Sequence, residues 1–344
     1  MVKLVYFGNK LSKHGGSKSV METLEPLFEE FCQVRSYSGV KNQYLRLLDM
    51  IYGFFATGLR SDLIIIDVYS TKNFYFAWLL SILSGFFKQP YVLFLHGGNL
   101  PERYLHSRKK VDFMFKRAKK IVAPSGYLKS FFEEKGYSVS LIPNLIDIKK
   151  FPFQMRDFAN PALIYVRGFG KIYNPLMTVK AIKSLRNKYP QVSLVMLGNN
   201  TDDLYNEVQQ LIINEDLHTN IKIMGKMSQA EWIRLSGGYN IMLSNPLIDN
   251  APVSIIEGMA LGLIIISTKV GGIVSLLKDK EDAFLVDSND HEGMANTIME
   301  ILENKSLALK MRESARAKAE SFSWEYIKPL WEDLLVNSGK RDAN

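Results

Sequence analysis

Cysteine is nearly absent from this 344-residue sequence, and long apolar runs are missing as well. Cys32 stands alone, which excludes an internal disulfide framework and favours a packing role for its thiol. The longest apolar run, Phe74 to Phe87, is too short to cross a bilayer comfortably. Lys3 to Phe7 already reads as a strand, without the apolar region of a signal peptide. These absences predict a cytoplasmic protein, with the inner face of the cell membrane as the alternative location.

Residues that bind metals or nucleic acids in recognisable patterns are also missing. No Cys/His cluster has zinc spacing, and no D-x-D pair is present to hold a metal–diphosphate. There is no zinc-finger spacing, RNA-binding signature or basic low-complexity tail. The sequence therefore predicts no metal, no cofactor and no nucleic-acid partner.

Positive charge is present in excess, but it is uneven. Residues 1–150 hold 22 Lys and Arg against 12 Asp and Glu, a balance of +10, whereas the whole chain carries +8. The excess is concentrated between Arg108 and Lys120. A solvated helix face and attraction to an anionic partner such as lipid headgroups both explain this cluster.

Apolar strand-like runs alternate with helical patterns along the whole chain, which predicts parallel sheets covered by helices on both faces. A polar stretch containing proline, Lys149 to Pro161, interrupts the alternation and reads as a linker. The sequence therefore predicts two doubly wound, Rossmann-like domains that face each other across a ligand cleft. We expect the first at residues 1–150, the second at 151–321, and a C-terminal helix and tail at 322–344.

Glu257 is the most informative single residue. It is the only charged residue between Asp249 and Lys269, on a short predicted helix, Val253 to Leu261. An unpaired carboxylate in an apolar place costs several kcal/mol or becomes neutral. We therefore expect the protein or a ligand to supply hydrogen-bond donors to Glu257.

Other candidates for binding follow predicted strands. Gly15 and Gly16 lie between a strand and a helix, where backbone N–H groups can bind a phosphate or a sugar, although a plain turn explains them equally. His96 ends an apolar strand, and a structural role is its alternative. Arg167 and Lys171 lie on a glycine-bearing loop and suit a diphosphate, unless they are ordinary surface charges.

Several segments together resemble the retaining glycosyltransferases of family 4, which have the GT-B fold. The run from Asp249 to Gly272 resembles the family's E-x7-E segment, E-G-F-P-x-x-x-x-E-A-M-A-x-G-x-P-V-V-A-T-x-x-G-G. Ile142 to Phe151 resembles its I-P-N-G-x-D-x-x-x-F segment at the linker. Ala123-Pro124-Ser125, Ile221 to Gly225 and Phe322 to Glu325 match further steps of the same pattern. The resemblance covers nearly the whole chain and implies a C-terminal helix that crosses back to the first domain.

The resemblance also implies roles for individual residues. Glu257 would accept hydrogen bonds from the nucleotide ribose, and Asp249 would contact the donor sugar. Arg167 and Lys171 would neutralise the diphosphate, and His96 would touch the donor sugar near the reaction centre. Gly15 and Gly16 would lie near the donor phosphate and the acceptor. The remaining donor contacts would come from Asn250, Ala251, Pro252, Val253 and Ser254.

The sequence departs from the family pattern at three places. Asp249 is one methylene shorter than the usual Glu. The usual Gly-Arg order reads Arg167-Gly168, and Tyr173 stands at the later Lys position, so the two phosphate cations are shifted. Leu145 replaces a glycine and Ile264 a proline, both of which we interpret as structural.

The resemblance implies transfer of a sugar, with retention, from a UDP-, GDP- or other nucleotide-sugar to a hydroxyl, without a metal or a protein general base. The acceptor would be a saccharide or lipid-linked saccharide, in cell-surface polysaccharide synthesis. The basic first domain and the apolar stretch Tyr75 to Phe87 suggest peripheral contact with an anionic membrane, although a buried helix covering the sheet is the stronger explanation of that stretch. A GT-B-fold epimerase and a catalytically silent subunit of a polysaccharide-assembly complex remain as alternatives.

Overall fold

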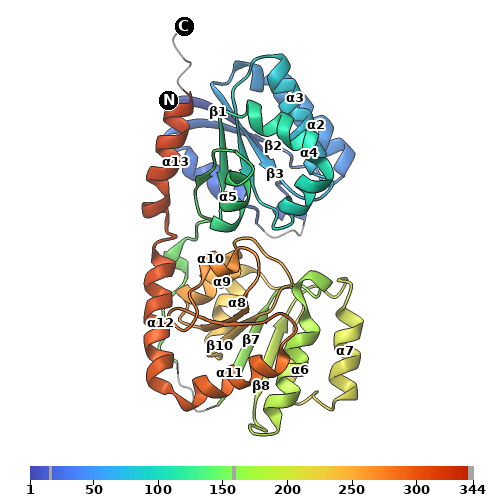
Figure 1. The fold of residues 1–344 in the computed structure, drawn as a ribbon, viewed down its shortest axis with the longest axis vertical. Coiled ribbons are helices and arrows are strands. Elements are labelled where there is room, and N and C mark those ends of the chain that lie inside the picture. Colours follow the sequence, from blue (N-terminus) through green and yellow to red (C-terminus); the bar gives the residue numbers. More distant parts are fainter. Residues whose placement is uncertain (15–17, 157–159, 340–344) are drawn as a thin grey trace. The chain divides into compact units, whose positions relative to one another are not determined.

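The computed structural model describes residues 1–14, 18–156 and 160–339, which fold as two α/β units (Figure 1). Unit 1 comprises Met1–Asn144 together with Glu325–Asn344, and unit 2 comprises Leu145–Trp324. Each unit contains one six-stranded sheet in which every strand pair is parallel. The predicted architecture of two parallel α/β sheets is confirmed.

The sheet of unit 1 has the strand order β2-β1-β3-β4-β5-β6. Its strands are β1 Val2–Phe7, β2 Cys32–Tyr37, β3 Leu63–Val68, β4 Tyr91–Leu95, β5 Lys120–Ala123 and β6 Ser140–Leu141. All six residues of β3 and all five of β4 are buried. Central strands covered on both faces are mostly apolar rather than alternating, which is why the sequence shows near-continuous apolar runs here.

Helices cover both faces of this sheet. They are α1 Val20–Phe28, α2 Gln43–Ala56, α3 Phe74–Phe86, α4 Leu100–Arg117, α5 Gly126–Glu133 and α13 Trp324–Gly339, with 3₁₀ turns Ser12–His14 and Gly58–Arg60. Ser19 and Glu22 form a reciprocal capping box at the start of α1, which satisfies two helix-end N–H groups. The sequence pattern predicts a helix only from Asp112 to Lys119, so it misses the part of α4 that begins at Leu100. That part contains Pro101 and is interrupted by the non-helical Ser107.

The C-terminal helix α13 packs on unit 1. Trp331 is fully buried, and its ring lies 5.2 Å from that of Phe28 and 5.1 Å from that of Phe94. The chain passes between the two units twice, near residues 144–145 and 324–325. These two segments are hydrogen-bonded to each other, since the Ile146 N–H donates to the Phe322 carbonyl at 3.0 Å. The prediction of a final helix that returns to the first domain is confirmed.

The sheet of unit 2 has the order β12-β11-β10-β7-β8-β9. Its strands are β7 Ala162–Val166, β8 Ser193–Leu197, β9 Ile221–Ile223, β10 Ile241–Ser244, β11 Ile264–Thr268 and β12 Phe284–Val286. Its helices are α6 Pro175–Arg186, α7 Tyr205–Asn214, α8 Gln229–Ser236, α9 Val253–Ala260, α10 Ile273–Leu276, α11 His291–Glu303 and α12 Lys305–Glu320, with 3₁₀ turns Ile148–Lys150 and Lys171–Tyr173. The strand order reverses between β7 and β10, and ligands bind beyond the carboxyl ends of strands at such a switch point.

Candidate functional site

An ion pair joins the two loops at the switch point of unit 2. Arg167 directly follows β7, Asp249 lies on the loop after β10, and an Nη2 of Arg167 binds Oδ2 of Asp249. The Asn250 N–H donates to the other carboxylate oxygen at 2.8 Å, and the Arg167 guanidinium lies 5.1 Å from the Tyr173 ring centre. Nε of Arg167 is buried and has no hydrogen-bond partner in the described part of the chain. The structure thus brings two predicted site residues together and leaves the buried Nε–H of Arg167 without a partner among the described residues.

Two glycines hold the loop of Asp249 against the start of α10. The Gly272 N–H donates to the Asp249 carbonyl at 2.9 Å. A Cβ on Gly272 would lie 1.7 Å from the Asn250 carbonyl oxygen, and one on Gly271 would lie 2.3 Å from the Asp249 oxygen. Gly271 also has φ +49°, a left-handed conformation that glycine adopts without steric cost. This close backbone approach fixes the loop that leads into α9.

Glu257 lies on α9 and is 7% exposed. The side-chain amide of Gln229, on α8, donates to its carboxylate. Burial raises the pKa of Glu257 to about 7, while the Gln229 hydrogen bond, the Arg167 charge and a Trp232 hydrogen bond oppose the rise. The protein therefore supplies donors to this carboxylate but leaves much of its desolvation uncompensated, so a ligand with further donors would stabilise its charged form.

Helix α9 presents its N-terminus at the loop that carries Asp249. N–H groups in a first helical turn lack intrahelical acceptors, and the helix dipole adds positive potential there. Ser254, in that turn, has a buried hydroxyl without a hydrogen-bond partner among the described residues. At the other end, Arg156 donates to the Leu261 carbonyl at 2.9 Å and Arg316 to the Ala260 carbonyl at 2.6 Å. Two arginines thus satisfy the carbonyl groups at the C-terminal, negative end of α9, whereas the Ser254 hydroxyl at its N-terminal, positive end has no partner among the described residues.

The structure gives less support to the other residues predicted to bind the donor. Lys171 is exposed on a 3₁₀ turn and forms no ion pair within the described ranges, so it is a weaker candidate than Arg167. Gly15 and Gly16 lie outside the described residues. Asn250 is buried, and Ala251, Pro252 and Val253 complete the loop and enter the first turn of α9.

His96 belongs to a buried cluster at the carboxyl end of the sheet in unit 1. It follows β4, and its Nε2 lies 2.7 Å from Oδ1 of Asp67 at the end of β3. Asp67 also accepts hydrogen bonds from the hydroxyls of Tyr6 at 3.0 Å and Tyr69 at 3.1 Å. The Tyr69 ring stacks on the imidazole with centroids 5.2 Å apart. The imidazole is therefore held by a carboxylate and a ring, so its orientation is defined before any ligand arrives.

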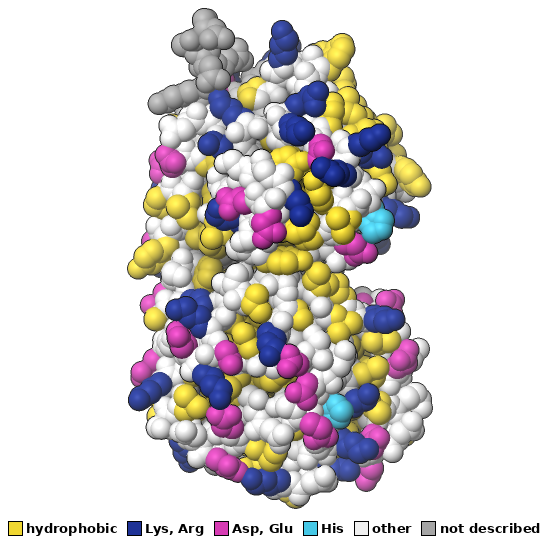
Figure 2. Space-filling view, viewed as in Figure 1, with side chains coloured by type: hydrophobic (Ala, Val, Ile, Leu, Met, Phe, Trp, Pro, Cys, Tyr) yellow, Lys and Arg dark blue, Asp and Glu magenta, His cyan; other side chains and the backbone are white. Residues whose placement is uncertain are grey.

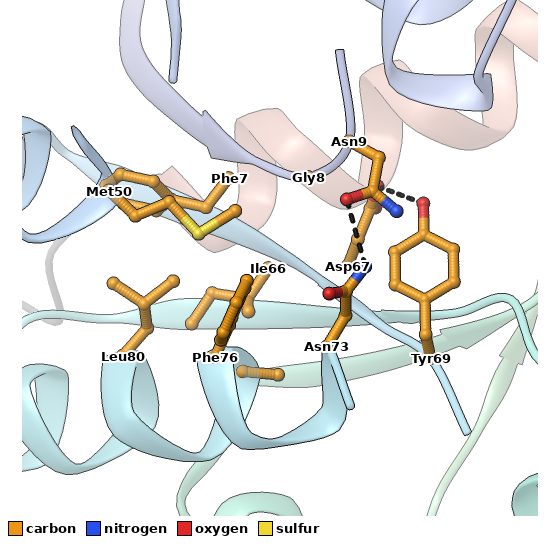
Figure 3. A pocket seen from close by; sticks show the side chains of 11 residues that line it. Phe7, Gly8, Asn9, Met50, Ile66, Asp67, Tyr69, Asn73, Phe76 and Leu80 are labelled. Atoms are coloured by element: carbon orange, nitrogen blue, oxygen red, sulfur yellow. Dashed lines mark hydrogen bonds between the residues drawn. The ribbon is translucent and has the colours of Figure 1, made fainter. Parts of the chain in front are cut away.

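A pocket opens beside this cluster, at the switch point of the sheet in unit 1 between β1 and β3 (Figure 3). Its polar side is formed by Asn9, Asp67, Tyr69 and Asn73, and its apolar side includes Phe76. The Asn73 side-chain amide donates to Oδ1 of Asn9 at 3.2 Å. Asp67 reaches the edge of the pocket only because residue 8 is glycine, since a Cβ there would lie 2.2 Å from Oδ2 of Asp67.

Two structural searches bear on metal and membrane chemistry. Within residues 1–14, 18–156 and 160–339 no group of three or more His, Cys, Asp and Glu side chains could hold a metal ion. In the same ranges no helix combines the length and the apolar character needed to span a bilayer.

Sequence reasoning missed Asp67 and Gln229. Asp67 is the only charged residue in the strand Leu63–Val68, the same kind of anomaly that identified Glu257. That signal was available and would have found it. Gln229 is an ordinary polar residue at the start of a helix. It lies 28 positions from Glu257 in the sequence, and only the fold brings the two side chains together.

Residues 149–318 match the family model of the group 1 glycosyl transferases. An uncharacterized glycosyltransferase of Methanocaldococcus jannaschii is 21% identical over 256 residues, which cover 71% of this chain and 69% of that protein. A second relative is the Escherichia coli UDP-Gal:alpha-D-GlcNAc-diphosphoundecaprenol alpha-1,3-galactosyltransferase. It is 24% identical over 217 residues, which cover 58% of this chain and only 55% of the enzyme.

Solved structures share the fold over nearly the whole chain. The Anabaena protein HepE, in complex with UDP-glucose, superposes with a TM-score of 0.78 at 18% identity, covering 98% of this chain and 100% of that one. At this identity the likeness establishes the fold, which is GT-B.

Proposed function

Because this chain belongs to the group 1 glycosyltransferases, we propose that it transfers a sugar from a nucleotide-diphosphate sugar to a hydroxyl, with retention at the anomeric carbon. The observation that carries the proposal is Glu257, a buried carboxylate with a pKa of about 7 on the helix that begins beside the Arg167–Asp249 pair. Ribose hydroxyls are donors that would stabilise its charged form. HepE, whose structure contains UDP-glucose, has the same fold and makes a UDP-sugar the first donor to test.

The diphosphate is the leaving group, and its developing charge requires donors and cations. We propose that Arg167 and the first turn of α9 supply them, with the exposed Lys171 as a second charge. The buried Nε of Arg167 and the hydroxyl of Ser254 support this assignment, because both lack partners among the described residues. Asp249, which Arg167 holds in place, would contact the donor sugar, and Asn250, Ala251, Pro252 and Val253 would line the donor site.

The acceptor side is proposed to be residues 1–150, and the donor side residues 151–321. His96 would touch the donor sugar near the reaction centre, with Asp67 as its positioning residue. Gly15 and Gly16 would lie near the donor phosphate. We assign no protein general base, because a donor phosphate oxygen would take the acceptor proton during attack on the same face.

We propose a saccharide carried on a lipid diphosphate as the acceptor, in cell-surface polysaccharide synthesis. Its support is the E. coli relative, which is named for such a diphosphoundecaprenol acceptor. The positive balance of residues 1–150 is compatible with an anionic acceptor at the inner face of a membrane.

A thermal-shift panel of nucleotide sugars tests the donor assignment. We expect one UDP- or GDP-sugar to raise the melting temperature of the native protein and to raise that of Glu257→Gln by a smaller amount. The matched control is Glu313→Gln, an exposed residue on α12, which should retain the full shift. Unchanged donor affinity and turnover in Glu257→Gln would contradict the ribose assignment.

Product stereochemistry tests the reaction. NMR of the product should show the anomeric configuration of the donor sugar, and an inverted linkage would refute retention. Slow hydrolysis of the donor without acceptor is also expected, since water competes with the acceptor. A protein that binds a nucleotide sugar but neither hydrolyses nor transfers it would instead be a silent subunit.

A further inference from the structure

Helix α2 exposes an apolar face instead of a polar one. Its exposed residues are Tyr44, Leu45, Leu48, Tyr52 and Phe55, and no polar or charged residue of the helix is exposed. Tyr44 and Tyr52 are 79% and 68% exposed. At about 100° per residue, the five positions occupy an arc of about 100° on one side of the helix. A helix on the surface of a globular protein normally places charged and polar residues on this arc.

The opposite side of α2 packs on the core of unit 1. Met50 and Phe54 are buried in the core of unit 1, and Gly53 allows close approach to the sheet, since a Cβ there would lie 2.4 Å from the Tyr37 ring. The outer apolar face is therefore not needed for packing within the unit. Contiguous exposed apolar patches of this kind mark interaction sites.

The end of α3 extends the apolar face. The Phe87 ring lies 5.6 Å from that of Phe55, and Phe86, 79% exposed, lies 5.0 Å from Phe87. The rest of α3 is mostly buried, so the stretch Tyr75 to Phe87 serves mainly as core. The exposed apolar surface thus comes chiefly from α2, for which the sequence analysis predicted no exposed apolar face.

Basic residues surround this face, and acidic ones are scarce. Lys41 precedes α2, Lys88 follows Phe87, and Lys110 of α4 lies 5.2 Å from the Trp78 ring on α3. There is no Asp or Glu between Asp67 and Glu102. In Figure 2, yellow side chains lie at upper right, where Figure 1 draws α2, α3 and α4, with dark blue side chains beside them.

We propose that the outer face of α2, with Phe86 and Phe87, docks on the surface of an anionic lipid bilayer. Tyrosine and phenylalanine side chains suit the boundary between headgroups and acyl chains, while the lysines attract anionic headgroups. Asp49, the one acidic residue of α2, is half-buried and accepts a hydrogen bond from the Ser38 N–H at 2.8 Å. The face therefore lacks the exposed acidic residues of protein interfaces built on paired charges. The inference deepens the proposed function, because it would bring the protein to the membrane that holds a lipid-linked acceptor.

Vesicle flotation tests the docking. The native protein should float with vesicles of phosphatidylcholine and phosphatidylglycerol at low salt, and less with phosphatidylcholine alone or at high salt. Leu48→Glu/Tyr52→Glu should lower the partition coefficient by about tenfold or more, because two inserted side chains become charged. Lys41→Gln/Lys88→Gln should lower it by about fivefold per charge, and only for anionic vesicles. The matched control Ile213→Glu alters an equally exposed residue of unit 2 and should bind as the native protein does.

Two results would overturn the proposal. One is absence of binding to anionic vesicles at low salt, and the other is binding that Leu48→Glu/Tyr52→Glu leaves unchanged. A dimer that this double variant dissociates in light scattering, without vesicle binding by the native protein, would assign the face to a second copy instead.

Donor-induced thermal stabilisation separates this inference from the proposed function. The double variant should keep the native melting temperature and its shift with nucleotide sugar, which shows that it is folded. Vesicle binding without any nucleotide-sugar binding would retain the docking face and refute the transferase. Transfer to a soluble acceptor without vesicle binding would do the reverse.

Discussion

Replacing Glu257 by glutamine should make the ligand-free protein more stable, and by an amount that depends on pH. The carboxylate is buried, and burial raises its pKa to about 7 from a reference value of 4.5. Glutamine has nearly the same shape, carries no charge, and retains an oxygen that can accept from the Gln229 amide. The substitution therefore removes the desolvation of a charge with little change in packing.

The size and sign of the effect follow from the two pKa values. Between about pH 4.5 and pH 7 the folded protein holds a proton on Glu257 that the unfolded chain has released, so stability falls as the pH rises. The difference between a pKa of 4.5 and one of about 7 corresponds to about 3 kcal/mol, reached above pH 7 where both states are ionised. Glu257→Gln should therefore match the native protein near pH 4.5 and exceed its unfolding free energy by about 3 kcal/mol at pH 8.

Urea unfolding of both proteins at several pH values between 4.5 and 8 measures this difference. Glu313→Gln removes the same charge from an exposed position of unit 2 and should give a difference near zero at every pH. A Glu257→Gln difference that does not change with pH would refute the reasoning, as would a variant less stable than the native protein at pH 8.

The raised pKa of Glu257 should also make donor binding depend on pH. If ribose hydroxyls donate to Glu257, they lower its pKa in the complex, and binding releases a proton below pH 7. Donor affinity should then rise with pH by up to about tenfold per unit below pH 7 and level off above it. Calorimetry in buffers of different ionisation enthalpy measures the released proton, and Glu257→Gln should release none.

Three further substitutions test the geometry around the two switch points. Gly272→Ala should lower donor affinity by about tenfold or more and the unfolding free energy by about 1–3 kcal/mol, because its Cβ meets the loop backbone. In the control Gly225→Ala the new Cβ has no atom within 4 Å, so both quantities should stay unchanged. Calorimetry measures the affinity, and urea unfolding measures the stability. Asp67→Asn should lower kcat by about a hundredfold with little change in donor KM, since it misorients the imidazole, and an equal change in both would contradict that role. Arg167→Ala should reduce turnover at least about tenfold more than Lys171→Ala, because only Arg167 is held by Asp249, and steady-state kinetics compares them.

The sheets and their covering helices could be predicted because their signal is local. The strands Leu63–Val68 and Ile264–Thr268 are fully buried, and each begins with a run of at least three consecutive apolar residues that is visible in the sequence. The part of α4 before Asp112 was missed because Pro101 and the non-helical Ser107 interrupt its period. The four-residue α10 is too short for any periodic signal.

The sequence identified single unusual residues of the site, but not which side chains contact each other. Glu257 stood out as a lone charge in an apolar stretch, but its partner Gln229 belongs to a different helix, and no local pattern connects the two. The pairing of Arg167 with Asp249 spans 82 positions and depends on the order of β7 and β10 in the sheet. Long-range contacts of this kind become visible only when the strand order is known.

Asp67 and Glu257 together show why a lone charge is informative in this fold. Each is a carboxylate in an otherwise apolar element near a switch point, one at the end of β3 and the other on α9. The protein satisfies Asp67 with two tyrosines and His96, so this carboxylate orients an imidazole. Glu257 receives fewer donors and has a raised pKa, so a ligand can still gain from binding it. The number of donors that the protein itself supplies therefore distinguishes a positioning carboxylate from a binding one.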